Sequence, residues 1–373
     1  MGKRHHFTLV PALLSAGAFF LFASAAAADR DGPEQAFVQA VEAGKHDSLA
    51  QLSTRIDDPL MQTYALWWRL QREETGASFA EIAAFLDEHP GWPRSNKLRR
   101  NAERAIDHTS DASDVVEFFA TRPPLSGSGA IAHLDALKKL GRTDAIPHLA
   151  QAYWVNLNFN PGDEHLFLQH HGRQLDERTH IERLDRLIWD RVYKSAERMI
   201  KRVDAGEAAK AKARIALAKR ANGVDSAIAR VPAGLRDDPE LAYERLQWRR
   251  AKDRDAAAAE ILETYPGSER PRPGLWAKEA RILARRAIDD GHYSEAARLA
   301  ADHGLLQGGA FAESEFLAGW VRLAFLEEPN AAEAHFDRLY GGVKYPISRA
   351  RAAYWKARAA EARGNDLLAR EWY

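Results

Sequence analysis

The sequence contains no cysteine among its 373 residues. Because disulfides, thiolate nucleophiles, zinc–thiolate sites and lipid-acylated cysteines all require that residue, the chain can contain none of them. Neither sign of charge predominates, with 53 Lys and Arg against 53 Asp and Glu, so the composition does not indicate a nucleic-acid partner. Strand signals are also scarce, since no run of alternating β-branched residues occurs. The stability of the fold must therefore come from packed helices.

Long hydrophobic runs are missing as well, apart from one near the start. Lys3 and Arg4 precede a short apolar core, Leu9–Phe22, and the small residues Ala26–Ala28 follow it in a pattern typical of a cleavage site. The core is shorter than the ~20 residues that a membrane span needs, which favours a cleaved secretion signal over a membrane anchor. We therefore assign residues 1–28 to a signal peptide. We expect a periplasmic protein with no stable membrane insertion.

Helical patterns fill the rest of the chain. Hydrophobic residues make up 46% and charged residues 28% of the sequence, which is typical of a globular protein. Five glycines follow helical stretches and are expected to reverse the chain between paired helices. They lie in the segments Ala43–Lys45, Leu140–Arg142, Ala205–Glu207, Asp290–His292 and Arg363–Asn365. Their spacing is uneven, so the repeat is degenerate.

The stretch from Lys344 to Tyr373 shows the hairpin pattern most clearly. Ser348 is expected to cap a helix that ends before Gly364. The residues of the expected buried face recur at helical spacing, and they are Ala350, Ala353, Tyr354, Ala357 and Ala360. The spacing across Leu283–Ala300 is more complete and looks like a tetratricopeptide repeat.

Several boundaries elsewhere can be predicted from local signals. Ser78 and Glu81 have the spacing of a capping box, whereas the Gly/Ser run Ser126–Gly129 is expected to be a gap between helices. Residues 155–162 are expected to form an irregular loop. Asp58 and Pro59 are expected to start a helix with one side made of Leu60, Tyr64, Trp67 and Gln71.

These patterns together predict an all-α fold. One helical hairpin cannot bury its own apolar face, so each hairpin is expected to stack on its neighbours. We predict a right-handed superhelix of tetratricopeptide-like hairpins, curved or ring-forming, that occupies residues 29–373 as one domain without a Gly/Ser linker. The last helical pattern stops at Tyr373 with no capping signal, so this domain is expected to be incomplete at its C-terminal end.

Few residues in the sequence form a pattern that points to chemistry. His165, His170 and His171 cluster, but no His-Glu-x-x-His spacing exists, and adjacent histidines are expected on different sides of a helix. A phosphate-binding loop and a Gly-x-Ser-x-Gly elbow are also missing from the sequence. We therefore predict no metal site and no cofactor. Most of the ten tryptophans lie at positions that belong to the apolar faces of expected helices, which favours core packing over sugar stacking.

The segment Arg186–Arg220 is rich in basic residues, with 11 Lys and Arg and only four Asp and Glu. Such a segment can form a surface that attracts an anionic glycan. It can equally form solvated helix faces with local ion pairs such as Glu197–Lys201. The second interpretation is favoured, and the first stays open.

Four segments give the chain a resemblance to a known family. They are Pro346–Trp355, Phe311–Trp320, Gly223–Pro232 and His303–Leu305. By their composition and their order along the chain they resemble the amino-terminal helical region of the soluble lytic murein transglycosylases, and the resemblance extends from about Phe37 to Tyr373. It implies a ring-like α-superhelix, a periplasmic location and peptidoglycan glycan strands as the substrate. Whether the superhelix grips the glycan, frames a pore or docks other cell-wall enzymes as partners stays open.

The resemblance also implies where the chemistry lies. In that family one glutamate of a lysozyme-like domain protonates the glycosidic oxygen, and the sugar's own 6-hydroxyl displaces the bond to give a 1,6-anhydro product. The family's Glu-Ser motif precedes its Gly-Leu-Met-Gln segment, whereas here Glu313–Ser314 follows Gly304–Gln307. Glu313 also begins a periodic helix, so it is interpreted as structural. The linker and catalytic domains are expected to be absent from residues 1–373.

The sequence thus predicts the substrate-framing superhelix of a periplasmic lytic transglycosylase, an enzyme of the lyase type that cleaves the MurNAc–GlcNAc β-1,4 bond. This chain alone is expected to be inactive, with no catalytic residue, and its substrate-binding residues are left unassigned. A periplasmic tetratricopeptide-like adaptor that binds partner proteins is the alternative.

Overall fold

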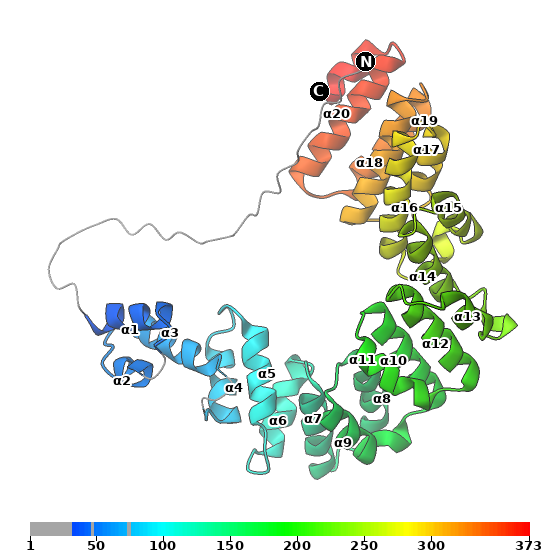
Figure 1. Cartoon of the computed structure of the whole chain (residues 1–373). Coiled ribbons are helices and arrows are strands. Elements are labelled where there is room, and N and C mark those ends of the chain that lie inside the picture. The colour runs from blue at the N-terminus through cyan, green and yellow to red at the C-terminus, as the bar shows by residue number, and fades with distance from the viewer. Residues whose placement is uncertain (1–31, 46–47, 73–75) are drawn as a thin grey trace. The chain divides into compact units, whose positions relative to one another are not determined.

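A computed structural model describes residues 32–45, 48–72 and 76–373, and every regular element in them is a helix (Figure 1). The predicted all-α fold is therefore confirmed for this part of the chain. The predicted signal peptide, residues 1–28, lies outside the described residues. Among the described helices, none combines the length and the apolar character needed to cross a membrane.

The chain divides into two compact units, Met1–Ser110 and Asp111–Tyr373. The single domain predicted from the sequence spans both. The described helices of the first unit are α1 (Pro33–Glu42), α2 (Leu49–Ser53), α3 (Pro59–Leu70), α4 (Phe79–Glu88) and α5 (Ser95–Ala105).

The second unit continues with sixteen α-helices and four short 3-10 turns in chain order. They are α6 (Ala112–Thr121), α7 (Gly127–Lys139), α8 (Ile146–Asn156), α9 (Pro161–His171), η2 (Gly172–Gln174), α10 (Glu177–Trp189), α11 (Tyr193–Met199), η3 (Ile200–Arg202), α12 (Ala205–Ala218), α13 (Val224–Ala229), η4 (Ala233–Leu235), α14 (Pro239–Arg250), α15 (Asp255–Thr264), η5 (Gly267–Glu269), α16 (Pro273–Asp289), α17 (Tyr293–Ala301), α18 (Gly309–Ala324), α19 (Pro329–Gly342), α20 (Pro346–Ala362) and α21 (Asp366–Trp372).

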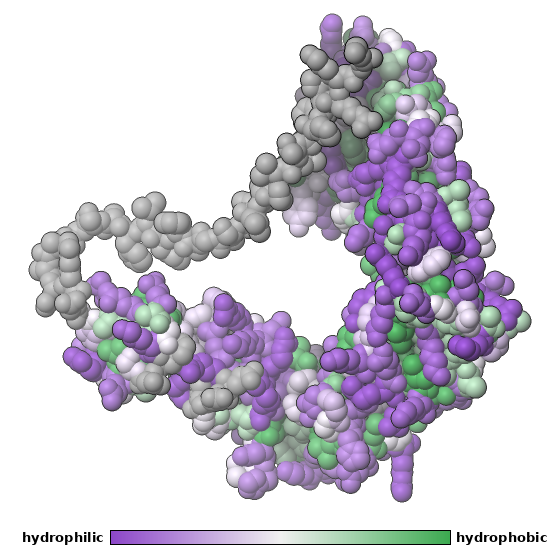
Figure 2. All heavy atoms as spheres, in the orientation of Figure 1, coloured by the Kyte–Doolittle hydropathy of each residue, from purple (hydrophilic) through white to green (hydrophobic). Residues whose placement is uncertain are grey.

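Helices that follow one another in the sequence pack side by side, as a stack of hairpins requires. In the second unit α16 packs on α17, α17 on α18, α18 on α19, and α19 on α20. Each contact buries a local cluster, so the apolar core is a series of patches between neighbours. Hydrophilic residues cover most of the visible face of both units, with hydrophobic residues showing between helices (Figure 2). Handedness and ring closure stay predictions.

Four of the five predicted turn glycines adopt the left-handed conformation that ends a helix. Their φ angles are +66° at Gly44, +70° at Gly141, +79° at Gly291 and +73° at Gly364. The prediction was wrong at Gly206, which lies in the first turn of α12 after Asp204 has capped that helix through its side chain. Glycine is common at both positions, so the residue alone does not distinguish a helix end from a helix start.

The Ser126–Gly129 run is not the predicted gap. Ser126 caps α7 by accepting a hydrogen bond from the Gly129 amide, and the glycines belong to the first turn of the helix. Gly127 is needed for close packing, because a Cβ there would lie 2.4 Å from Phe159 Cδ1. By contrast, the Ser78 cap is confirmed, since its hydroxyl accepts from the Glu81 amide at 3.2 Å. Within residues 155–162, only the stretch between α8 and α9 is irregular.

The predicted buried face of the C-terminal hairpin is confirmed only in part. The helix begins at Pro346, so Ser348 lies inside its first turn and makes no cap. Ala357 and Ala360 are fully buried as predicted, but Tyr354 is 48% exposed. Ala352 and Ala359, which the prediction did not include, are fully buried as well. Alanine occurs on several sides of α20, so its spacing did not identify the side that packs against α18 and α19.

Candidate functional site

A hollow in the first unit combines aromatic and cationic side chains. It encloses about 340 Å³, a volume within the usual range of small-molecule sites, roughly 300–1,000 Å³. Its lining comes from the end of α1, from α3 and the residues after it, and from the start of α5. The lining residues are Val41, Tyr64, Trp67, Trp68, Gln71, Arg72, Arg94 and Lys97. We call this the aromatic–basic hollow.

The aromatic side of the hollow is held by ring contacts within the first unit. Trp67 lies 5.6 Å from Tyr64 and 5.9 Å from Trp92 between ring centroids, and its indole N–H donates to the Pro93 carbonyl at 2.8 Å. Trp68 packs edge-on against Phe37. These contacts fix the rings while leaving them half-buried, so part of each face stays accessible to a ligand.

Three cations surround those rings. The Arg72 guanidinium lies 5.2 Å from the Trp68 ring centroid, a distance at which the cation is attracted to the ring face. Arg94 has a φ of +56° at the start of α5 and donates to the Gln71 side chain at 3.4 Å. Lys97 is exposed on the first turn of α5. The hollow can therefore bind an anionic ligand that also presents a flat apolar face.

Burial also affects one ionisable group of the hollow. Desolvation, with a smaller contribution from Glu42, raises the pKa of Tyr64. The Tyr64 hydroxyl therefore stays neutral at physiological pH and can serve as a hydrogen-bond donor.

Part of this hollow could have been predicted from the sequence. The predicted side of the helix that begins at Pro59 contains three residues that line it, Tyr64, Trp67 and Gln71. Leu60 of the same predicted side is 68% exposed. The cations were missed because Arg94 and Lys97 follow a break of several residues after α4, and only the fold brings them beside α3.

Two larger hollows lie in the second unit but lack this combination. One of about 570 Å³ lies between α15 and α16, and its charged lining contains both signs, including Asp253, Arg254 and Arg286. The other, of about 560 Å³, is lined by α17 and the end of α18. Neither has a Trp, Tyr or Phe side chain in its lining, so neither offers the large ring faces of the first hollow.

The basic segment Arg186–Arg220 is largely ion-paired in the structure. Six of its eleven cations contact carboxylates, which are Arg186, Arg191, Arg198, Lys210, Arg214 and Lys219. The predicted pair of Glu197 with Lys201 is wrong, because Glu197 contacts Lys219 of α12 at 2.6 Å. Paired cations attract a distant polymer weakly, which supports the interpretation of this segment as structural.

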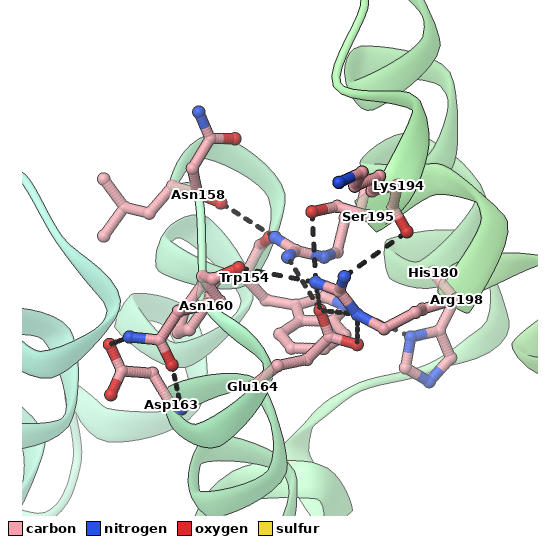
Figure 3. A network of polar contacts seen from close by, with 12 residues as sticks. Trp154, Asn158, Asn160, Asp163, Glu164, His180, Lys194, Ser195 and Arg198 are labelled. Atoms are coloured by element: carbon pink, nitrogen blue, oxygen red, sulfur yellow. Dashed lines mark hydrogen bonds and ion pairs between the residues drawn. The ribbon is translucent and has the colours of Figure 1, made fainter.

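One of these paired cations, Arg198, belongs to a buried arginine–glutamate cluster (Figure 3). Arg198 of α11 reaches Glu164 of α9 at 2.8 Å, and Glu164 is almost fully buried. Arg183 is fully buried over the Trp154 ring at 4.2 Å and donates to the Trp154 and Leu157 carbonyls at the end of α8. Desolvation lowers the pKa of Arg183 to about 9. The cluster ties α8, α9, α10 and α11 together.

The tryptophans only partly follow the prediction of core packing. Trp154, Trp189 and Trp276 are buried in the second unit. The other seven are half-buried, and two of them, Trp67 and Trp68, line the aromatic–basic hollow.

Glu313, interpreted from the sequence as structural, lies on α18. Its carboxylate contacts Arg351 of α20 at 2.9 Å. Ser314 is fully buried and accepts a hydrogen bond from Arg281 at 2.9 Å. The pair therefore joins α18 to its neighbouring helices, and Gly304 lies in the loop before α18 with a φ of +65°.

The histidine cluster is arranged differently from the expectation. His165 is exposed on α9. His170 and His171, expected on different sides of a helix, both lie near Asp135 of α7, at 3.7 and 4.0 Å from its Oδ1 atom. His171 is the last residue of α9, and its φ of −124° departs from helical geometry, so helical spacing does not describe where its ring lies.

Three comparisons with known proteins found no counterpart. No family model, no curated protein and no solved structure matches the chain. The class of protein that the structure defines is an all-α stack of helical hairpins, and the functional assignment depends on the motif resemblance and on the aromatic–basic hollow.

Proposed function

We propose that this chain is the superhelical portion of a periplasmic lytic murein transglycosylase. The whole enzyme would cleave the MurNAc–GlcNAc β-1,4 bond of peptidoglycan with a 1,6-anhydro product. The described helices would hold the glycan strand, and the reaction would take place in a separate catalytic domain. The stack of helical hairpins supports this proposal, as does the motif resemblance between Phe37 and Tyr373.

The aromatic–basic hollow is the observation that carries the proposal. Sugar rings have apolar faces that pack on indole rings, so the half-buried Trp67 and Trp68 suit a glycan. The stem peptides of peptidoglycan carry carboxylates, and Arg72, Arg94 and Lys97 supply complementary charge. A neutral polysaccharide would use the rings but not the cations.

A sedimentation assay with insoluble peptidoglycan sacculi tests the proposal. The purified chain should co-sediment with the sacculi, and the Arg72→Ala/Lys97→Ala variant should bind about tenfold more weakly, the effect expected from removing two solvent-accessible charged contacts worth about 0.7 kcal/mol each. The exposed cations Lys139 and Arg142 of the second unit provide a matched control. If the wild-type chain stays in the supernatant, or if Lys139→Ala/Arg142→Ala binds equally weakly, the proposal is wrong.

The predicted inactivity of this chain can be tested separately. A turbidity assay should show no clearing of sacculi, because no catalytic role is assigned to Glu313 or to any other residue. Clearing by the wild-type chain that is lost in Glu313→Gln would overturn the structural interpretation of Glu313.

An adaptor that binds partner proteins is the second candidate function, and one observation favours it. Apolar side chains are exposed on and just before the last helices, with Tyr345 at 77%, Ile347 at 83% and Leu367 at 76% exposure. Such residues are typical of protein contacts. A genomic reading frame that continues into a Glu-Ser and Gly-Leu-Met-Gln domain would favour the enzyme, whereas an early stop codon would favour the adaptor.

A further inference from the structure

Three metal-ligating side chains meet where the ends of α7 and α9 lie together in the second unit. The Nδ1 atom of His170 and the Nε2 atom of His171 lie 3.7 and 4.0 Å from Asp135 Oδ1. All three ligand atoms lie within 4.8 Å of one another. Around a tetrahedral Zn²⁺ with bonds of about 2.0–2.1 Å, ligand atoms are about 3.3 Å apart. A small closure of the three side chains would therefore place them at bonding distance.

The second observation is an unpartnered nitrogen at the same place. The His171 side chain is only 4% exposed, and its Nε2 atom is buried with no hydrogen-bond partner. The Asp135 Oδ1 atom is beyond hydrogen-bond distance at 4.0 Å. Buried imidazole nitrogens normally have a partner. A metal ion between His171 and Asp135 would supply one.

One cation lies close to the three ligands along the chain. Lys138 is exposed at the end of α7, so its ammonium group can turn towards solvent, although its charge would weaken the binding of a cation.

The chemistry of the ligands selects the class of metal. Two imidazoles and one carboxylate suit Zn²⁺ and its transition-metal neighbours, whereas Mg²⁺ and Ca²⁺ prefer oxygen ligands alone. We propose that Asp135, His170 and His171 bind one Zn²⁺-class ion that links α7 to the end of α9. The side chains of Asp135 and His170 are 40% and 38% exposed, so a water molecule can complete the coordination.

Calorimetric titration of the untagged, chelator-treated full chain with ZnCl₂ tests this inference. The wild-type chain should show a site with micromolar or tighter affinity that is absent in His170→Ala and at least tenfold weaker in Asp135→Asn. His170 is partly exposed, so its removal should leave the fold intact, which circular dichroism checks. MgCl₂ in place of ZnCl₂ should give no such site.

His165→Ala is the matched control, because His165 is exposed on the same helix and should leave the zinc site unchanged. Zn²⁺ should also raise the Tm of the wild-type chain and of His165→Ala, but not that of His170→Ala. The inference is overturned if the wild-type chain shows no zinc site, or if His170→Ala binds Zn²⁺ as tightly as His165→Ala does.

Discussion

Replacing Glu315 by glutamine tests how the second unit is held together. Glu315 is buried on α18 and accepts hydrogen bonds from three side chains on the neighbouring elements. His335 Nδ1 lies at 2.6 Å, Arg338 Nε at 2.8 Å and His303 Nε2 at 3.2 Å. The carboxylate thus joins α18 to α19 and to the loop after α17. A glutamine of the same size keeps the packing but removes the charge.

The magnitude follows from the burial of this cluster. Breaking a buried ion pair by removing one partner typically costs about 3–5 kcal/mol. Arg338 is half exposed and can turn to solvent, so we expect the lower end, about 3 kcal/mol. Such a loss should lower the Tm of a unit of this size by at least about 6 °C.

The same substitution should change the acid stability of the protein. Burial alone would raise the pKa of Glu315, but the hydrogen bonds from His303, His335 and Arg338 hold it well below its usual range. Because the folded pKa lies below the unfolded pKa, the cluster contributes its full stability above about pH 5 and loses it as the pH falls further. In Glu315→Gln this contribution to the decrease in unfolding free energy at acidic pH should disappear.

Urea denaturation followed by circular dichroism at pH 7 and at pH 4 measures both effects. Glu313→Gln is the matched control, since Glu313 lies two residues away on α18, and its pair with Arg351 is much more exposed. That variant should lose less than about 1 kcal/mol. Equal losses of unfolding free energy in the two variants would refute the reasoning. So would a Glu315→Gln variant that loses as much stability between pH 7 and pH 4 as the wild-type chain does.

Two further substitutions test the packing of the helices. Gly127→Ala should destabilise the second unit by about 1–3 kcal/mol, because the new Cβ would meet the Phe159 ring. Gly274→Ala places its Cβ in open space on α16, so it should be neutral or stabilising by up to about 1 kcal/mol. Urea unfolding midpoints measure both effects. Arg183→Met should lower the free energy of unfolding by about 2–4 kcal/mol, because two carbonyls at the end of α8 lose their buried charged donor. Arg178→Met is the control, because it removes only an exposed ion pair, and it should shift the thermal midpoint little.

The fold could be predicted from the sequence because its signals are local. A glycine that follows a helical pattern can take the left-handed conformation that ends a helix, as Gly141 and Gly291 do. Ser78 and Asp58 cap helices through contacts only three residues away. The same signals failed at Ser126–Gly129, where the reason for glycine is a distant ring, Phe159.

The candidate site could be predicted only in part, because its members meet through tertiary contacts. The spacing of Tyr64 and Trp67 places both on one side of α3, and no local pattern indicates that Lys97 of α5 lies beside them. The histidine pair shows a similar limit. Its carboxylate partner, Asp135, lies on another helix, and periodicity within α9 contains no information about α7.

The distribution of paired and exposed charges decides where the chain can attract an anionic glycan. A carboxylate beside a cation cancels most of the electric field of that cation, and salt screens the rest beyond a Debye length of about 8–10 Å. Arg214 is held by both Asp185 and Glu240, so it contributes little to the attraction of a glycan. Lys97 is exposed at the rim of the aromatic–basic hollow, where its field reaches solvent. Binding to sacculi should therefore weaken with added salt in the wild-type chain, and this salt dependence should be smaller in Arg72→Ala/Lys97→Ala. If the salt dependence were unchanged in that variant, the attraction would have to come from elsewhere in the chain.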